Sequence, residues 1–339
     1  MQQKGKDLIR QSDYENYDYR QFWQDNKRLY EDSSERLVIK KFISAIANKD
    51  AVFIDLGCGF GRLFSEYRDF STIILLDYSI NNLKNAKELI SRYVNNEARL
   101  MEKVIFVAAD VTRLPLKPDV IDYAMTVRVI HHMDDPGRYF EEVSRVVKTG
   151  GIFMLEFANK RNTKNILRFF AGRIKQSPFN AEPLQIGATI LDYHPNYIKH
   201  KLNQAGFKVK KMVSASNFRL GFLKRHVSLK ILLFFESIYQ NIFSFIDTGP
   251  SIFLKTILVR EKCSSGSNEN DSNTKKLGST SPISLFMCPA CQSTELFSAG
   301  PDKNSPEHIV EHEHIVKHIV CGSCQRQYPL IDGIFDFKV

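Results

Sequence analysis

The chain has 339 residues and a formal net charge of +9; 43% of its residues are hydrophobic and 12% are aromatic. This length allows one large domain and a small one, and this composition indicates a globular protein with a substantial core. No stretch reaches the ~18 consecutive apolar residues of a spanning helix, and Met1–Gln11 is too polar for a secretory signal. Six cysteines without an export signal favour metal ligands or free thiols over disulfides, so we expect a cytoplasmic protein.

The positive charge is concentrated in residues 161–230. This segment contains fourteen lysines and arginines but only two acids, so it carries +12 and the rest of the chain carries −3. A local excess of this kind indicates an anionic partner, either a membrane surface or RNA, with ordinary solvated surface as the alternative.

The N-terminal segment, residues 1–48, is predicted to be helical and is rich in aromatic side chains. Apolar residues recur at helical spacing from Leu37 to Ile46, which predicts a helix just before the first strand. We expect the aromatic rings to pack on the sheet, with folding over a ligand as the alternative.

A short strand then leads into a glycine-rich turn. Val52–Ile54 is an apolar run typical of a buried parallel strand, and Asp55 ends it. Glycines follow at alternate positions, Gly57, Gly59 and Gly61. Glycine adopts positive φ and lets a ligand lie against the backbone. We expect Arg62–Tyr67 to begin a helix whose free N–H groups face that ligand.

The next two strands also end in an acid. Thr72–Leu76 is followed by Asp77, and Val104–Ala109 is followed by Asp110. An acid about 20 residues after the glycine turn, at the end of the next strand, suits a pair of ribose hydroxyls. Three acids at three successive strand ends are much rarer than one glycine-rich turn.

The remaining elements alternate in the manner of an α/β protein. Further strands are expected at Val120–Arg128, Ile152–Phe157, Lys208–Val213 and Phe253–Val259. Helices are expected from Ser79 through Ile90, from Gly137 to Lys148 and from Pro195 to Ala205. This alternation predicts a doubly wound sheet.

Over about residues 35–260 these motifs resemble the class I S-adenosylmethionine-dependent methyltransferases. The resemblance implies a Rossmann-like sheet of seven strands, the last of them antiparallel, and S-adenosylmethionine as the cofactor. It assigns the methionine to the glycine turn, the ribose to Asp77 and the adenine to Asp110. The residues that it implies for cofactor binding are Asp55, Gly57, Gly59, Gly61, Asp77, Tyr78, Asp110, Val111 and Val127. An NAD-linked oxidoreductase is disfavoured by the glycine spacing.

Methyl transfer needs few protein groups, because the cofactor carries the activated methyl group. Arg128 could bind an anionic substrate group, and His131 or His132 could accept a proton from an O–H or N–H acceptor. Packing of the two histidines at a helix start is the alternative. A lipophilic or lipid-linked small molecule is slightly favoured as the methyl acceptor. An RNA methyltransferase and a non-catalytic cofactor-binding scaffold are the other readings.

The composition also predicts the domain boundaries. We expect a methyltransferase domain at residues 49–261, with insertions at 158–194 and 214–251, followed by a flexible linker at 262–282. An apolar run at 227–246, too short to span a bilayer, could be a substrate lid, an interface or a membrane anchor.

The tail, residues 283–339, is predicted to be a small zinc-ribbon domain. Two Cys-x-x-Cys pairs would supply the four thiolates of one zinc ion, Cys288, Cys291, Cys321 and Cys324. The ending, Gln327–Phe337, resembles the small zinc-ribbon activators of tRNA and rRNA methyltransferases, which implies that the ribbon docks on the methyltransferase domain in cis. Four histidines would share one strand face and are expected to be solvated, with metal binding as the alternative: His308, His312, His314 and His318.

Overall fold

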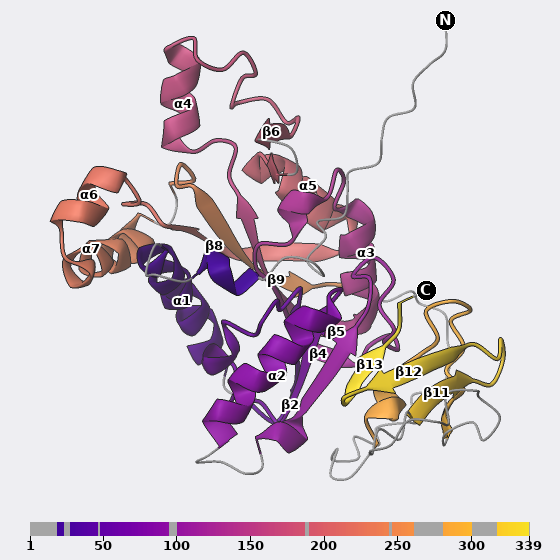
Figure 1. Ribbon diagram of the computed structural model, residues 1–339. Helices are drawn as coiled ribbons and strands as arrows, with labels where there is room; N and C mark the ends of the chain where they lie inside the picture. The colour runs from indigo at the N-terminus through magenta and orange to yellow at the C-terminus, as the bar shows by residue number, and fades with distance from the viewer. Residues whose placement is uncertain are drawn as a thin grey trace, which may run out of the picture.

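The computed structural model describes residues 19–23, 28–46, 48–94, 100–186, 190–243, 246–260, 281–299 and 317–338. Its centre is a seven-stranded sheet in the order β3-β2-β1-β4-β5-β9-β8 (Figure 1). The strands are β1 (Val52–Leu56), β2 (Thr72–Asp77), β3 (Val104–Ala108), β4 (Ile121–Thr126), β5 (Val147–Ala158), β8 (Phe207–Ala215) and β9 (Ser251–Leu258). β1 to β5 pair in parallel, and β9 is antiparallel to both β5 and β8. The predicted doubly wound sheet with an antiparallel seventh strand is confirmed.

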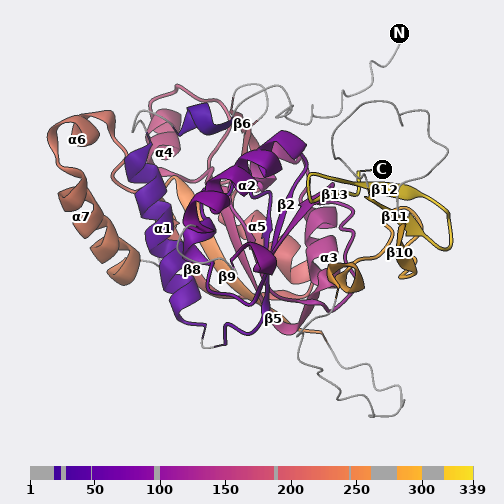
Figure 2. The ribbon, with the colours of Figure 1, turned by 60° about the horizontal axis from the view of Figure 1, so that its bottom comes forward.

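Helices cover both faces of this sheet (Figure 2). On one face α1 (Leu29–Ser44) and α2 (Ile80–Val94) bury their apolar side chains against alternate strand residues such as Phe53. On the other face α3 (Gly137–Val146) and α5 (Pro195–Gln204) pack against the intervening residues such as Ile54. Because both faces are covered, every residue of β1 and β3 is buried. This burial explains why β3 and the first three residues of β1 are uninterrupted apolar runs.

The helix expected from Arg62 is absent. The structure instead has the short 3-10 turn η2 (Phe64–Glu66), within a series of hydrogen bonds that each span three residues. Phe64, Tyr67 and Phe70 recur at intervals of three and are all fully buried. A 3-10 turn has three residues per turn, so side chains three apart lie in line, whereas in an α-helix Phe64 and Phe70 would be turned apart by about 120°. The expected helix was therefore wrong, because the aromatic spacing fits the tighter turn.

Each predicted insertion contains at least one helix of its own. Residues 158–194 include α4 (Thr163–Phe170) and the hairpin β6 (Leu184–Ile186) and β7 (Ile190–Asp192). Residues 214–251 include α6 (Gly221–His226) and α7 (Leu229–Ile242). Ser251 pairs with both Ala158 and Ala215, so the two insertions leave the sheet at the same end. Among the described residues, no helix is long and apolar enough to cross a bilayer.

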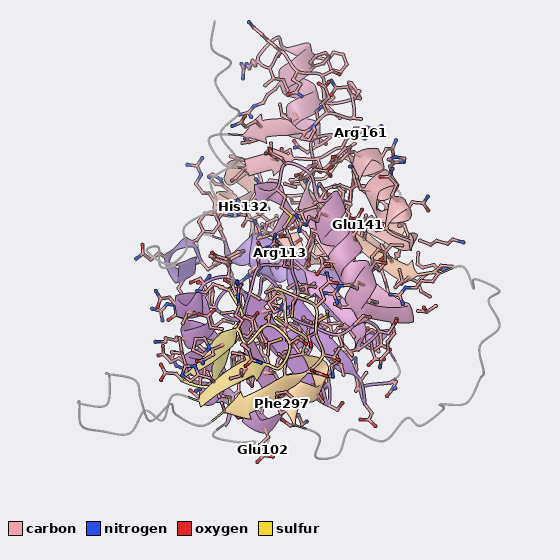
Figure 3. All side chains as sticks on the ribbon, turned by 90° about the vertical axis from the view of Figure 1, so that its right-hand side faces the viewer. Glu102, Arg113, His132, Glu141, Arg161 and Phe297 are labelled. Carbon is pink, nitrogen blue, oxygen red and sulfur yellow. The ribbon has the colours of Figure 1, made fainter. Side chains whose placement is uncertain are left out.

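The C-terminal ribbon extends the same sheet beyond β3. Its strands are β10 (Leu296–Ala299), β11 (Lys317–Cys321), β12 (Gln327–Ile331) and β13 (Ile334–Asp336). β13 lies parallel to β3, with Asp336 opposite Ala108, and the Phe337 N–H donates to the Ala108 carbonyl at 2.8 Å. Figure 3 views the molecule from the ribbon side, with Phe297 of β10 at the lower front. The ribbon thus covers a sheet edge that would otherwise carry unpaired backbone groups.

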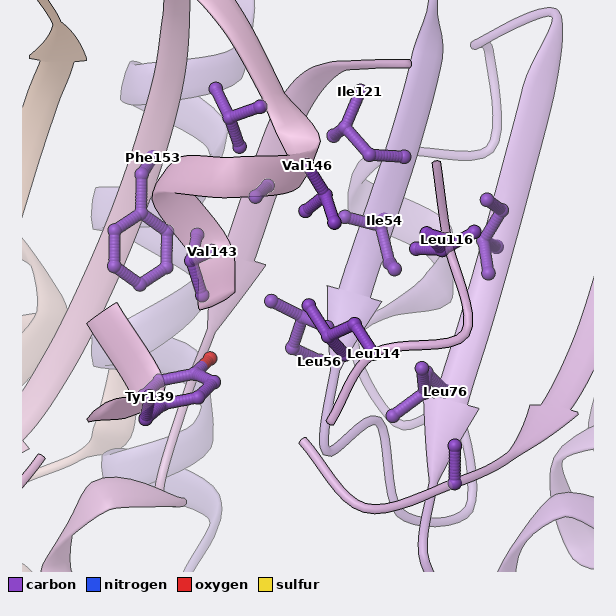
Figure 4. Close-up of a cluster of buried hydrophobic side chains, with 14 of the residues drawn as sticks. Ile54, Leu56, Leu76, Leu114, Leu116, Ile121, Tyr139, Val143, Val146 and Phe153 are labelled. Carbon is purple, nitrogen blue, oxygen red and sulfur yellow. The ribbon is translucent and has the colours of Figure 1, made fainter. Parts of the chain in front are cut away.

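The ribbon and the central sheet share one hydrophobic core. η5 (Pro282–Leu285) leads into Phe286, whose ring centroid lies 5.0 Å from that of Phe337 and 5.1 Å from that of Phe335. Phe286 is fully buried in the cluster that also contains Leu114 and Leu116 beside β4 (Figure 4). The cis docking implied by the resemblance is present in the structure. The domain boundaries remain predictions, because residues 261–280 lie outside the described residues.

We expect Phe286→Ala to destabilise the whole chain by about 3–5 kcal/mol, because a buried phenylalanine is lost from the shared core. Thermal unfolding followed by circular dichroism should show one cooperative transition at lower temperature. Phe297→Ala is the matched control, because this ribbon phenylalanine is 59% exposed. Two separate transitions, with only the smaller one moved, would contradict a shared core.

Candidate functional site

The predicted cofactor residues meet at the carboxyl end of the parallel strands. The glycine turn follows β1, Asp77 ends β2, Asp110 follows β3, and Val127 follows β4. Strand order reverses between β1 and β4, and ligands of open α/β sheets bind at such a switch point. In Figure 3, His132 lies toward this end of the sheet, and Glu102, which precedes β3, lies at the opposite end.

The glycine turn has the backbone conformation that the sequence predicts. Gly57, Gly59 and Gly61 all have positive φ, between 54° and 77°. The N–H groups of Gly57 and Cys58 both donate to the Leu76 carbonyl, at 2.7 and 3.0 Å. A Cβ at Gly57 would lie 2.3 Å from Cγ2 of Val129, so only glycine fits there.

Asp77 connects this turn to the start of α2. Its carboxylate accepts hydrogen bonds from the N–H of Gly59 at 2.8 Å, the N–H of Ser79 at 3.0 Å and the Asn82 side-chain amide at 3.2 Å. These donors fix the orientation of a carboxylate that is almost fully buried. Asp77 therefore shapes the glycine turn, and its role as the acceptor of the ribose hydroxyls stays a prediction.

Asp110 forms an Asx turn after β3. One of its oxygens accepts from both the N–H and the hydroxyl of Thr112, each at 2.8 Å. Val111 is half-buried against the core, and Val127 is buried. Tyr78 is partly exposed, and Nζ of Lys338 lies 5.4 Å from its ring centroid, so the end of the ribbon reaches this side of the site.

Asp55 faces the protein interior. Its carboxylate accepts a hydrogen bond from the Tyr67 hydroxyl at 2.6 Å. Burial raises the pKa of Asp55 to about 7, although the Tyr67 hydrogen bond and the Arg62 charge oppose this rise. Tyr67 directly follows the 3-10 turn η2 and is fully buried.

A buried ion-pair network joins α1 to the site, and the sequence did not predict it. Glu35 of α1 is fully buried and accepts from Arg62 at 2.8 Å and from Nε of Arg128 at 2.9 Å. Burial opposes ionisation of Glu35, but the Arg128 and Arg62 charges outweigh it and hold its pKa below the usual value. Both guanidinium groups also face the Trp23 ring, at 3.8 and 5.1 Å from its centroid. Only the fold brings these residues together, so no local pattern could have identified them.

Arg128 has a backbone conformation that is unusual for a residue other than glycine. Its φ is 62°, and its N–H donates to the buried carboxylate of Glu156 at 2.8 Å. Strained backbone of this kind is often found at functional sites. The role of Arg128 as an anion receptor stays a prediction, and in this structure its guanidinium is paired with Glu35.

The two candidate histidines lie in η4 (Ile130–His132), directly after β4. Their ring centroids are 4.1 Å apart, and Ile130 is fully buried. Burial, followed by the nearby His132 and Arg128, lowers the pKa of His131 well below its usual value. His131 is therefore neutral at pH 7, and its role and that of His132 as proton acceptors stay predictions.

The four ribbon cysteines form a second candidate site. Their sulfur atoms all lie within 4.8 Å of one another, with Cys288–Cys324 and Cys291–Cys321 separations of 3.6 and 3.5 Å. Zn–S bonds of about 2.3 Å in a tetrahedron place sulfurs about 3.8 Å apart, so this donor set fits zinc. The Tyr328 hydroxyl lies 3.0 Å from the sulfur of Cys288.

The structure describes only one residue of the predicted histidine cluster. His318 lies in β11, and the other three histidines of the predicted cluster lie outside the described residues. The structure therefore adds no further ligand to the four sulfur atoms among the described residues.

Comparison with known proteins agrees with this geometry. Residues 54–155 match the family model for the methyltransferase domain. An uncharacterized chloroplastic methyltransferase of Arabidopsis thaliana is 36% identical over 104 residues, which make up 30% of this chain and 29% of that protein. A sterol 24-C-methyltransferase of Schizosaccharomyces pombe is 28% identical over 102 residues, which make up 30% of this chain and 26% of that protein.

A solved complex of the Haloferax volcanii Trm112 methyltransferase activator with a methyltransferase is similar in structure. The identity is 14% and the TM-score 0.47, with 70% of this chain and 95% of that chain covered, and no functional conclusion follows from similarity at this level. The chain spans 29% to 47% of the length of the first curated relatives that it matches. The similarity in sequence to methyltransferases therefore covers the central strands and the glycine turn.

Proposed function

We propose that the protein is an S-adenosylmethionine-dependent methyltransferase. The observation that carries this proposal is the pair of acids, Asp77 and Asp110, at the ends of β2 and β3, beside the glycine turn that follows β1. A dinucleotide site would need one such acid, whereas a nucleoside linked to an amino acid has separate ribose, adenine and methionine groups to hold.

The proposed roles follow from where each residue lies. Asp77 accepts the ribose hydroxyls, because its carboxylate is already oriented beside the glycine turn. Asp110 and Val111 border the adenine, and the turn from Gly57 to Gly61 surrounds the methionine. When bound, S-adenosylmethionine supplies an activated methyl group on a sulfonium, so the chain needs mainly to orient the acceptor and exclude water.

The acceptor site is assigned to the end of β4, next to η4. Arg128 and the two histidines lie there, and α1 covers this region through the Glu35–Arg128 ion pair. A neutral His131 could receive a proton from an O–H or N–H acceptor, although burial makes it a weak base.

We favour a lipophilic or lipid-linked acceptor, because the two insertions at this end of the sheet expose large apolar side chains. An RNA acceptor is the second candidate, and the lysines and arginines of residues 161–230 are the observation that favours it. A cofactor-binding scaffold without catalysis would show cofactor binding but no turnover. A cytoplasmic location, including binding at a membrane surface, remains a prediction.

We further propose that Cys288, Cys291, Cys321 and Cys324 hold one zinc ion. The sulfur separations support this assignment, and so do the two Cys-x-x-Cys pairs, each of which we call a knuckle. Two knuckles from opposite ends of the ribbon would be joined by the ion, and a unit this small has little core of its own. The ion would therefore maintain the ribbon in the shape that pairs with β3.

Asp77→Ala tests the cofactor assignment. Two charge-assisted hydrogen bonds to the ribose would be lost, at about 1.5–3 kcal/mol each at most. Titration calorimetry with S-adenosylmethionine should show an affinity at least about tenfold lower. Asp69→Ala, which removes a highly exposed acid, is the control. Unchanged affinity in a folded Asp77→Ala protein would overturn the assignment.

Cys291→Ser tests the metal assignment at an exposed ligand position. Elemental analysis should find one zinc per chain in the wild type and much less in the variant. The unfolding temperature of the whole chain should also fall, because the ribbon shares the core of the sheet. Ser323→Ala, which lies between Cys321 and Cys324 in the second cysteine pair, is the control and should keep its zinc. Wild-type protein that is purified without chelator and lacks zinc would refute the proposal.

A further inference from the structure

Helix α7 buries two polar side chains and exposes several large apolar ones. Glu236 and Gln240 are fully buried, whereas Phe234 and Ile242 are 62% and 61% exposed. A surface helix in a globular protein ordinarily has the opposite arrangement. The outward apolar side is therefore a feature that needs an explanation.

Hydrogen bonds to Glu236 fix this orientation. Its carboxylate accepts from the Tyr30 hydroxyl at 2.7 Å and the Ser34 hydroxyl at 2.8 Å, both on α1. It also accepts from the N–H groups of Ser216 at 2.9 Å and Asn217 at 3.1 Å, just after β8. Rolling α7 to bury its phenylalanines would break these bonds and leave a buried charge without partners, which is strongly unfavourable.

The neighbouring helices add more exposed apolar side chains. Phe222 of α6 is 65% exposed and Phe170 of α4 is 74% exposed. The N-terminus of α4 is hydrogen-bonded to the segment after α7, since the Thr163 N–H donates to the Thr248 carbonyl at 2.8 Å. Figures 1 and 2 show α4, α6 and α7 on the side of the molecule away from the ribbon. The ribbon therefore does not cover them.

Positive charge surrounds these apolar side chains. Residues 163–180 and 219–243 contain eight lysines and arginines: Lys164, Arg168, Arg173, Lys175, Arg219, Lys224, Arg225 and Lys230. Lys224 is paired with Glu31 of α1 at 2.8 Å, so the charge of the other seven is the relevant one. The only acid in these residues is Glu236, which is buried. We define these two segments as the insertion surface.

We propose that the insertion surface docks on an anionic lipid bilayer. The phenylalanines would enter the boundary between headgroups and acyl chains, and the lysines and arginines would contact headgroup phosphates. A second copy of the chain is a poor occupant, because it would bring the same positive charges face to face. RNA would use the cations but would leave the apolar side chains exposed to water.

Docking would place the acceptor site near the membrane. Both insertions leave the sheet where Ala158, Ser251 and Ala215 are paired, at the same end as the glycine turn. A lipophilic acceptor could then pass from the bilayer to the end of β4. This part of the inference rests on the proposed methyltransferase function, whereas the docking itself does not.

Vesicle flotation tests the proposal with the full-length chain. We expect the wild type to float with vesicles of equimolar phosphatidylcholine and phosphatidylglycerol, and to float much less with phosphatidylcholine alone. The Phe222→Ser/Phe234→Ser double variant should bind anionic vesicles at least about tenfold more weakly, because it loses two large apolar anchors. Phe297→Ser is the matched control, since this exposed phenylalanine lies on the ribbon, and it should float like the wild type.

The outcomes separate the alternatives. Wild type that stays in solution, or a double variant that floats as well as the wild type, would overturn the proposal. A wild-type dimer that the double variant abolishes, with no flotation, would replace it with self-association. A tRNA complex that Arg225→Glu/Lys230→Glu weakens and the phenylalanine variant does not, again without flotation, would favour RNA. Calorimetry with S-adenosylmethionine should be unaffected in the double variant, so failure of docking and failure of the methyltransferase assignment are distinguishable.

Discussion

The backbone pairing between β13 and β3 is the contact on which the organisation of this protein depends. It turns a ribbon and a seven-stranded sheet into one eleven-stranded sheet. Its last hydrogen bond, from Phe337 to Ala108, lies two residues before Asp110. Loss of the ribbon would therefore remove the edge partner of β3 next to the strand end that is proposed to border the adenine. In this arrangement metal binding, strand pairing and cofactor binding would stabilise one another, because each requires the same folded state.

The ion-pair network of Glu35 on α1 is a second long-range contact at the site. The ion pairs of Glu35 with Arg62 and Arg128 attach α1 to the glycine turn and to the end of β4. Asp32 supplies a second carboxylate to Arg62, so two acids face the two guanidinium groups, and several hydrogen bonds fix their geometry. The site is thus held between two parts of the chain, one before and one after residues 54–155, and neither part belongs to the stretch that matches the family model.

The sequence was informative wherever structure depends on local spacing. Parallel strands buried on both faces appear as apolar runs, and the acids at their ends were found for that reason. The cysteine pairs were equally clear, because each knuckle is local. The helix after the glycine turn was wrong, because aromatic residues at intervals of three outweighed the usual continuation of the motif. The Glu35 ion pairs and the orientation of α7 could not be predicted, because both depend on partners that are remote in the sequence.

The position of β13 also affects how the chain must fold. β3 occupies residues 104–108, but its edge partner occupies residues 334–336. During synthesis the five central strands can assemble while one edge of the sheet still exposes its backbone groups. Contacts between such distant segments form slowly, and an open strand edge invites pairing with other chains in the meantime. Folding intermediates of this protein should therefore depend on chaperones until the ribbon has been made and has closed the edge.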